Sequence, residues 1–127
     1  MDLGADVIKG LKVGSIVFLK GSLGVGKTVF VKGMARGIGL DERVVKSPTF
    51  TLMNIYRGEK TIYHIDLYRA SVADVEILED FLPSEDGITV VEWPEILENI
   101  VKPDMTVIMD FGEGENERKV TFVGRGG

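Results

Sequence analysis

The amino-acid sequence predicts a three-layer α/β sandwich whose central sheet is mostly parallel and carries antiparallel hairpin additions. Three observations lead to this prediction. Short apolar runs alternate along the chain with segments of helical periodicity. A glycine-rich loop joins the apolar run at residues 16–19 to a segment whose apolar residues recur at roughly helical spacing. Two further pairs of β-rich segments, in the middle and at the end of the sequence, are typical of hairpins.

Composition narrows the class of protein. The chain has 127 residues, 44% of them hydrophobic and 28% charged, and we expect one domain over residues 1–127. No run approaches the roughly 18 apolar residues that span a bilayer, and no secretory signal is visible, so we expect no membrane association. Cysteine is absent, which excludes disulfides and fits a cytoplasmic location.

The net charge of −5 argues against strong independent binding to nucleic acid, which normally needs a basic surface. Acidic residues gather in several short clusters in the second half of the chain. These clusters indicate a solvated face or, alternatively, a docking surface for a basic partner.

The first third of the chain predicts two helices around one strand. Residues 2–11 have the pattern of a short amphipathic helix. The apolar run at 16–19 is expected to be a buried strand, and the helix after the glycine-rich loop is expected to end near Gly37 and Gly39.

The middle of the chain predicts a loop, a hairpin and a helix. Ser47-Pro48-Thr49 opens the loop. Residues 50–57 and 61–68 are rich in β-formers and are separated by residues 58–60, which indicates a hairpin. Ser71, with Asp74 three residues on, predicts a capped helix start, and the helix ends before Pro83.

The last third predicts three strands and a short helix. Residues 88–91 form a second buried apolar run. A short helix is expected through Ile96, Leu97 and Ile100. Residues 105–111 and 119–123 are expected to pair around the loop at 112–117.

The glycine-rich loop is the strongest functional signal. Residues 21–28, GSLGVGKT, satisfy G-x-x-x-x-G-K-[ST], the phosphate-binding loop or Walker A motif. Glycines allow successive main-chain N–H groups to converge on an anion, a lysine adds charge for the β- and γ-phosphates, and a threonine hydroxyl is a ligand for Mg²⁺. The fold is therefore expected to be P-loop NTPase-like. The residues expected to hold the nucleotide are Ser22, Leu23, Gly24, Val25, Gly26, Lys27 and Thr28.

Hydrolysis requires acids that hold Mg²⁺ and orient water. Asp66 follows residues 62–65, and Glu92 follows residues 88–91, so each acid stands at the end of a predicted strand. Carboxylates there reach the ion directly or through its waters. Glu92 has the cleaner strand before it, and an acid that merely caps or pairs is the alternative for either residue.

Three other residues are candidates for the site. Thr49 is a candidate sensor of the γ-phosphate, although its spacing alone favours a turn residue entering the hairpin. His64 is expected to be a packed strand histidine rather than a catalytic base. Propensity alone favours a core position for Trp93 over a place in the wall of the site.

Four segments resemble the TsaE family, also called YjeE, the small bacterial ATPases of tRNA threonylcarbamoyladenosine (t6A) synthesis. They are residues 21–28 (GSLGVGKT), 47–52 (SPTFTL), 64–69 (HIDLYR) and 91–94 (VEWP). The first motif is shared by many NTPases, whereas the other three are specific in this order and spacing. The resemblance covers nearly the whole chain.

The resemblance implies an ATPase with ATP and Mg²⁺ as cofactors that works with the TsaB–TsaD pair, is weak alone and meets tRNA only through that complex. In the family, TsaD transfers threonylcarbamoyl to the adenosine beside certain anticodons, and TsaE is needed for repeated cycles. Lys27 would hold the phosphates and Thr49 would lie in a switch-like loop. Thr28, Glu92 and Asp66 would serve the metal, with Asp66 and Glu92 as the site acids. By the same likeness Trp93 joins the nucleotide site.

One departure and several alternatives stay open. Family members usually carry a short strand and a threonine-containing turn before the first helix, and these help to bind adenine. Here the chain starts at Met1, inside that expected helix, so adenine recognition is open. A nucleotide-sensing module without needed hydrolysis and a small P-loop kinase are alternative functions. A GTPase is disfavoured because no Asn-Lys-x-Asp stretch occurs, and we expect a monomer in the absence of partners.

Overall fold

The computed structural model describes residues 3–21, 24–46, 53–68, 70–82, 85–111 and 118–124. Its centre is a six-stranded sheet in the order β2-β3-β4-β1-β5-β6. The inner pairs β3–β4, β4–β1 and β1–β5 are parallel, and the outer pairs β2–β3 and β5–β6 are antiparallel hairpins. The strands are β1 (Ile16–Lys20), β2 (Met53–Arg57), β3 (Thr61–Asp66), β4 (Ile88–Glu92), β5 (Met105–Phe111) and β6 (Arg118–Gly124).

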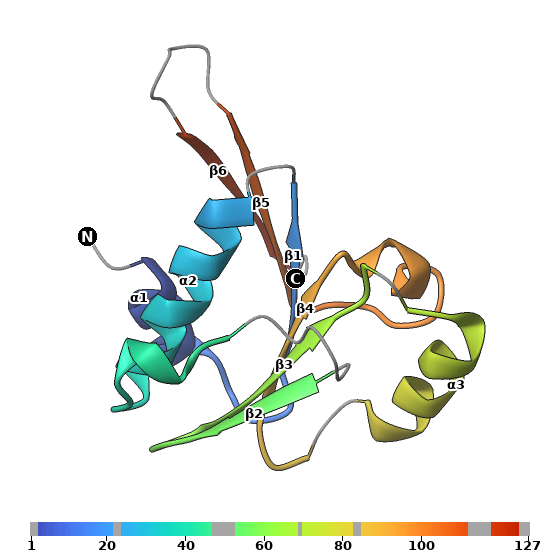
Figure 1. The fold of residues 1–127 in the computed structure, drawn as a ribbon, viewed down its shortest axis with the longest axis horizontal. Coiled ribbons are helices and arrows are strands. Elements are labelled where there is room, and N and C mark those ends of the chain that lie inside the picture. The colour runs from blue at the N-terminus through green and yellow to red at the C-terminus, as the bar shows by residue number, and fades with distance from the viewer. Residues whose placement is uncertain are drawn as a thin grey trace.

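Helices cover both faces of the sheet, which gives the three layers expected from the sequence (Figure 1). Helices α1 (Leu3–Gly10) and α2 (Gly24–Gly37) lie together on one face, and α3 (Val72–Phe81) lies on the other. Two short 3₁₀ helices, η1 (Glu42–Val44) and η2 (Pro94–Leu97), complete the described structure. Within the described residues, no helix has the length and apolarity needed to cross a membrane.

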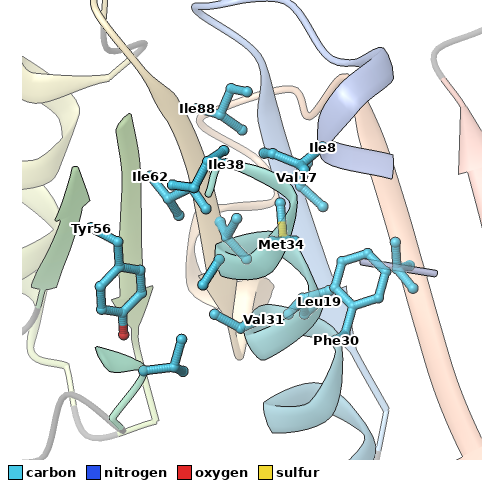
Figure 2. Close-up of a cluster of buried hydrophobic side chains, with 14 of the residues drawn as sticks. Ile8, Val17, Leu19, Phe30, Val31, Met34, Ile38, Tyr56, Ile62 and Ile88 are labelled. Carbon is cyan, nitrogen blue, oxygen red and sulfur yellow. The ribbon is translucent and has the colours of Figure 1, made fainter. Parts of the chain in front are cut away.

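Strand β1 supplies side chains to two hydrophobic cores because successive residues of a strand point to opposite faces. Val17 and Leu19 join the core beneath α1 and α2, whereas Ile16 and Phe18 join the core beneath α3. Figure 2 shows the first core, in which α2 packs across the sheet. Strand β1 is therefore buried on both sides, as the apolar run in the sequence predicts.

The predicted start of α3 is confirmed in detail. Ser71 is the N-cap, and its hydroxyl accepts a hydrogen bond from Asp74 N–H at 3.2 Å. The Asp74 carboxylate in turn accepts one from Ser71 N–H at 2.9 Å. This reciprocal capping box satisfies two donors that the helix itself cannot.

The turn of the β2–β3 hairpin is fixed against both helices of the first face. Glu59 N–H donates to the main-chain oxygen of Ile38, just after α2, at 2.8 Å. A Cβ on Gly58 would lie 2.3 Å from that same oxygen, so only glycine fits there. Lys60 Nζ donates to the carbonyls of Ile8 and Leu11 at 3.0 and 2.9 Å and so caps the end of α1.

One local prediction is wrong, and one short element was not predicted. The helix expected through Ile96, Leu97 and Ile100 is the single 3₁₀ turn η2, which ends at Leu97. It begins at Pro94, directly after the left-handed Trp93, and its backbone closes an i→i+3 bond from Glu98 N–H to the Glu95 carbonyl at 3.3 Å. The 3₁₀ turn η1 has no counterpart in the sequence prediction. Ser47, Pro48, Pro83 and the loop at 112–117 lie outside the described residues.

Candidate functional site

The chain leaves β1 through Gly21 and enters α2 at Gly24. Gly21 has φ +108°, and a Cβ there would lie 2.0 Å from the main-chain oxygen of Met109 on β5. Both the backbone conformation and the close approach therefore require glycine at this position. The result is that α2 begins directly beyond the carboxyl end of β1. Ser22 and Leu23 lie outside the described residues, and Gly24 and Val25 are described as helical backbone only.

Lys27, in the first turn of α2, is the least expected buried residue of the chain. Its side chain is 1% exposed, and its Nζ has no hydrogen-bond partner within the described structure. The Nζ instead lies 3.9 Å from the centroid of the Trp93 ring. A cation over an indole face gains about 2 kcal/mol when desolvated, which is less than the cost of burying an ammonium without hydrogen bonds. The contact with Trp93 therefore compensates only part of the cost of burying the Lys27 ammonium.

Trp93 holds an unusual backbone conformation beside this lysine. It is the one non-glycine residue of positive φ in the described ranges, at φ 56° and ψ 55°. Such strain persists only where the surrounding structure imposes it, often at functional sites. The indole is 37% exposed and packs on Tyr68, with ring centroids 5.1 Å apart. Trp93 thus lies in the wall beside Lys27 and not in either core.

Asp66 and Glu92 are brought together by the register of two parallel strands. Each is the last residue of its strand, and they are direct partners across β3–β4. Glu92 is also the partner of Leu19 on β1, whose carboxyl end leads to α2. Asp66 is half-buried, and its Oδ1 accepts a hydrogen bond from Tyr68 N–H at 2.9 Å. Both acids therefore stand at the sheet edge where α2 begins.

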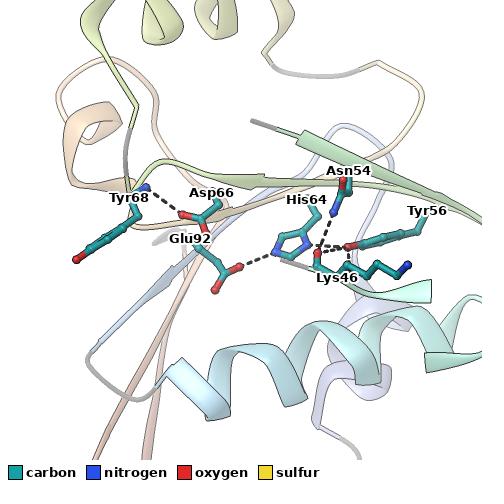
Figure 3. Close-up of polar contacts among 7 residues, drawn as sticks. All are labelled: Lys46, Asn54, Tyr56, His64, Asp66, Tyr68 and Glu92. Atoms are coloured by element: carbon teal, nitrogen blue, oxygen red, sulfur yellow. Dashed lines mark hydrogen bonds and ion pairs between the residues drawn. The ribbon is translucent and has the colours of Figure 1, made fainter. Parts of the chain in front are cut away.

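Glu92 is buried and has a hydrogen-bond partner that the sequence did not reveal (Figure 3). His64 Nε2 lies 2.6 Å from Glu92 Oε2, and His64 Nδ1 lies 2.8 Å from Tyr56 Oη. Burial raises the pKa of the Tyr56 phenol above its usual value, hydrogen bonds at the hydroxyl partly oppose this, and the charge of Glu92 raises it further. His64 is buried in its strand, as expected, and it also forms a hydrogen bond with the site acid Glu92.

The residues fit a triphosphate with Mg²⁺ better than a self-sufficient metal centre. The described part of the chain holds no group of three or more His, Cys, Asp or Glu able to bind a metal. Mg²⁺ characteristically takes one or two carboxylates and completes its shell with phosphates and waters. Thr28, next to Lys27 on α2, and the acids Asp66 and Glu92 are hard oxygen donors of this kind. Thr49 lies outside the described residues, as does Arg69 of the resembling segment.

A mostly parallel sheet with a phosphate-loop sequence between β1 and α2, and acids at the same edge, defines a P-loop NTPase-like α/β protein. Residues 1–120 match the family described as threonylcarbamoyl adenosine biosynthesis protein TsaE. The chain belongs to the TsaE family, which confirms the resemblance seen in its motifs.

Individual relatives agree with this assignment. The chain is 47% identical over 100 residues to the tRNA threonylcarbamoyladenosine biosynthesis protein TsaE of Synechocystis sp., a match covering 74% of this chain and 63% of that protein. It is 36% identical over 116 residues to the protein of the same name from Bacillus subtilis, covering 91% and 73%. The crystal structure of Bacillus subtilis YdiB superposes with a TM-score of 0.75 at 29% identity, covering 98% of this chain and 77% of that one.

Proposed function

We propose that the protein is a Mg²⁺-dependent ATPase that hydrolyses ATP to ADP and phosphate in tRNA t6A biosynthesis. In this role it supports the TsaB–TsaD complex during threonylcarbamoyl transfer to the adenosine beside the anticodon. The observation that carries the proposal is the buried Lys27 Nζ, which has no hydrogen-bond partner in the described structure and therefore calls for an anion. The matched family and its relatives support the pathway.

Each residue of the site has a role that follows from its chemistry. Lys27 would bind the β- and γ-phosphates, and Thr28, Glu92 and Asp66 would hold the ion, directly or through its waters. Bound Mg²⁺ would neutralise charge that develops on the phosphates. Glu92 and Asp66 orient water at the edge of the sheet, and Trp93 covers the lysine and limits access of solvent. Thr49 remains a proposed sensor of the γ-phosphate.

The cellular setting is part of the same proposal. The net charge of −5 supports contact with tRNA through the complex and not directly. We place the protein in the cytoplasm as a monomer that meets TsaB and TsaD there.

Calorimetric titration of ATP, ADP and GTP, with and without Mg²⁺, tests the binding step. We expect the adenine nucleotides to release heat on binding, and we expect Lys27→Met to abolish this heat. Lys32→Met, on the same helix, is the matched control.

Phosphate release should be slow for the protein alone and faster with TsaB–TsaD. Absence of nucleotide binding at millimolar concentrations, or equal phosphate release with and without the partners, would contradict the proposal. A phosphorylated metabolite in place of free phosphate would indicate a kinase.

A second candidate is a nucleotide-sensing module that does not need hydrolysis. The contact of the Lys27 ammonium with Trp93 would serve nucleotide binding whether or not Glu92 acts on water. Glu92→Gln separates the two functions in a reconstituted tRNA modification assay. Modification that persists after hydrolysis is lost would establish binding as the main role, whereas loss of both supports the ATPase.

A further inference from the structure

A chain of hydrogen bonds runs from Glu92 across two neighbouring strands (Figure 3). Glu92 Oε2 is 2.6 Å from His64 Nε2, and His64 Nδ1 is 2.8 Å from Tyr56 Oη. Glu92 ends β4, His64 lies in β3 and Tyr56 lies in β2. The pairing of His64 with Val90, and of Tyr56 with Ile62, puts all three on the sheet face that α2 covers. The three side chains are buried.

The donors and acceptors in this series of hydrogen bonds have one consistent arrangement when the Glu92 carboxylate is ionised and the His64 imidazole is neutral. A carboxylate only accepts, so His64 Nε2 carries the hydrogen and donates it to Glu92. His64 Nδ1 is then an acceptor, and the Tyr56 hydroxyl donates to it over 2.8 Å in preference to the Lys46 carbonyl at 3.2 Å. Lys46 N–H donates to Tyr56 Oη at 3.4 Å. Each group thereby fixes the orientation of the next.

The series of hydrogen bonds that starts at Glu92 ends at the main-chain N–H and carbonyl of Lys46. Asn54 Nδ2 donates to the Lys46 carbonyl at 2.8 Å, so this carbonyl keeps a donor when the Tyr56 hydroxyl donates to His64. Lys46 is therefore held to β2 through two side chains, Asn54 and Tyr56. The hydrogen bonds thus connect the acid at the sheet edge, through Tyr56 on β2, to the main chain of Lys46 beyond η1.

We propose that His64 is a positioning residue, held by Tyr56, that fixes the Glu92 carboxylate with Oε2 turned away from the reaction and Oε1 left for it. The proposal rests on the proposed ATPase function and deepens it. Neither His64 nor Tyr56 touches the nucleotide in this account, and both act through Glu92. Loss of such outer partners of a metal-site acid characteristically lowers activity by about 10- to 100-fold.

Two amide substitutions at His64 separate positioning from mere packing. The amide of Gln reaches the place of Nε2 and keeps a donor for Glu92, whereas the amide of Asn reaches only the place of Nδ1 and keeps the contact with Tyr56. We expect His64→Asn to lower kcat for ATP by about tenfold or more, with KM changed by less than about twofold. His64→Gln should recover to within about threefold of the unaltered protein. A folded His64→Asn protein with unaltered kcat, or equal losses in both variants, would overturn the proposal.

A second measurement uses the nucleotide-free protein and does not depend on hydrolysis. His64 is the sole histidine, so long-range ¹H–¹⁵N spectra of the imidazole report on it alone. For the neutral imidazole we expect the Nε2–H tautomer in the unaltered protein and a mixture of tautomers in Tyr56→Phe. An Nδ1–H tautomer or two exchanging tautomers in the unaltered protein would refute the positioning role. The Nε2–H tautomer in a protein that releases no phosphate would refute the ATPase instead.

Discussion

The indole of Trp93 covers the ammonium of Lys27, with 3.9 Å between Nζ and the ring centroid. The lysine lies in the first turn of α2, whereas the tryptophan follows the last residue of β4. Helix α2 and the end of strand β4 are therefore in contact through the Lys27 ammonium and the Trp93 ring. This contact holds Lys27 in place but leaves its three hydrogens unpaired within the described structure, so burial of this ammonium lowers the stability of the nucleotide-free fold.

Replacing Lys27 by methionine should stabilise the nucleotide-free protein. The change removes a buried ammonium and keeps most of its volume, and comparable replacements gain about 1–3 kcal/mol. Urea denaturation measures the free energy of unfolding, and Lys32→Met on the same helix serves as control. The same variant should lose the increase in Tm that ATP with Mg²⁺ gives the unaltered protein. A variant less stable than the control would show that the ammonium is not a burden to the fold.

Trp93 should report nucleotide binding by its fluorescence. It is the only tryptophan of the chain, it is 37% exposed, and it touches the lysine expected to bind phosphate. Adding ATP with Mg²⁺ should shift or quench its emission, and Lys27→Met should remove the effect. An unchanged spectrum at nucleotide concentrations that calorimetry shows to be saturating would place the nucleotide elsewhere.

Gly21 should not tolerate alanine, although Gly10 should. An added Cβ at Gly21 would meet the Met109 oxygen at 2.0 Å on a backbone of φ +108°, whereas nothing lies within 4 Å of one at Gly10. We expect Gly21→Ala to lower the free energy of unfolding by about 2 kcal/mol or more. Gly10→Ala, at the end of α1, should be neutral or stabilise by up to about 1 kcal/mol. Paired denaturation curves test this contrast, and equal effects would contradict it.

Lys60→Met should destabilise the protein by about 1–2 kcal/mol because it removes charge-assisted hydrogen bonds at the end of α1. The Lys60 ammonium donates to the carbonyls of Ile8 and Leu11. Lys12→Met, at an exposed lysine just beyond the same helix, is the control and should leave stability nearly unchanged. Thermal unfolding followed by circular dichroism compares the two variants, and equal Tm values would rule out the cap.

Stability at alkaline pH should depend on Tyr56. Its pKa is raised in the folded protein above the ordinary value of 10.0, chiefly by burial. As pH rises above about 10 the unfolded phenol ionises first, so the folded state loses stability by up to about 1.4 kcal/mol per pH unit. Tyr56→Phe should remove this part of the slope, while Tyr68→Phe, at an exposed ring, should keep it. Identical alkaline slopes in the two variants would contradict the prediction.

Much of the fold follows from short-range signals. The capping box of Ser71 and Asp74 can be read from four residues, and the apolar run of β1 predicts a strand that is buried on both faces. The phosphate-loop motif predicts the strand–loop–helix unit. These signals are local because the capping hydrogen bonds join residues three positions apart and each motif is contained in one short segment.

The chain of hydrogen bonds behind Glu92 could not be predicted in this way. His64 and Glu92 are 28 residues apart and meet only because β3 and β4 pair in a particular parallel register. Periodicity predicts a buried His64 but does not tell which polar group faces it. The position of Trp93 could not be predicted either. Tryptophan is usually buried in a core, but the left-handed backbone at this residue turns its side chain toward Lys27.

The hydrogen bond from Glu59 to the carbonyl of Ile38 has a consequence for ligand-driven motion. This bond joins the carboxyl-terminal end of α2, remote from the phosphate loop, to the β2–β3 turn. At that turn Gly58 packs directly against the main-chain oxygen of Ile38. A sliding displacement of α2 along its own axis would have to break this bond and move the turn as well. We therefore expect α2 and the β2–β3 turn to move together or not at all when nucleotide binds.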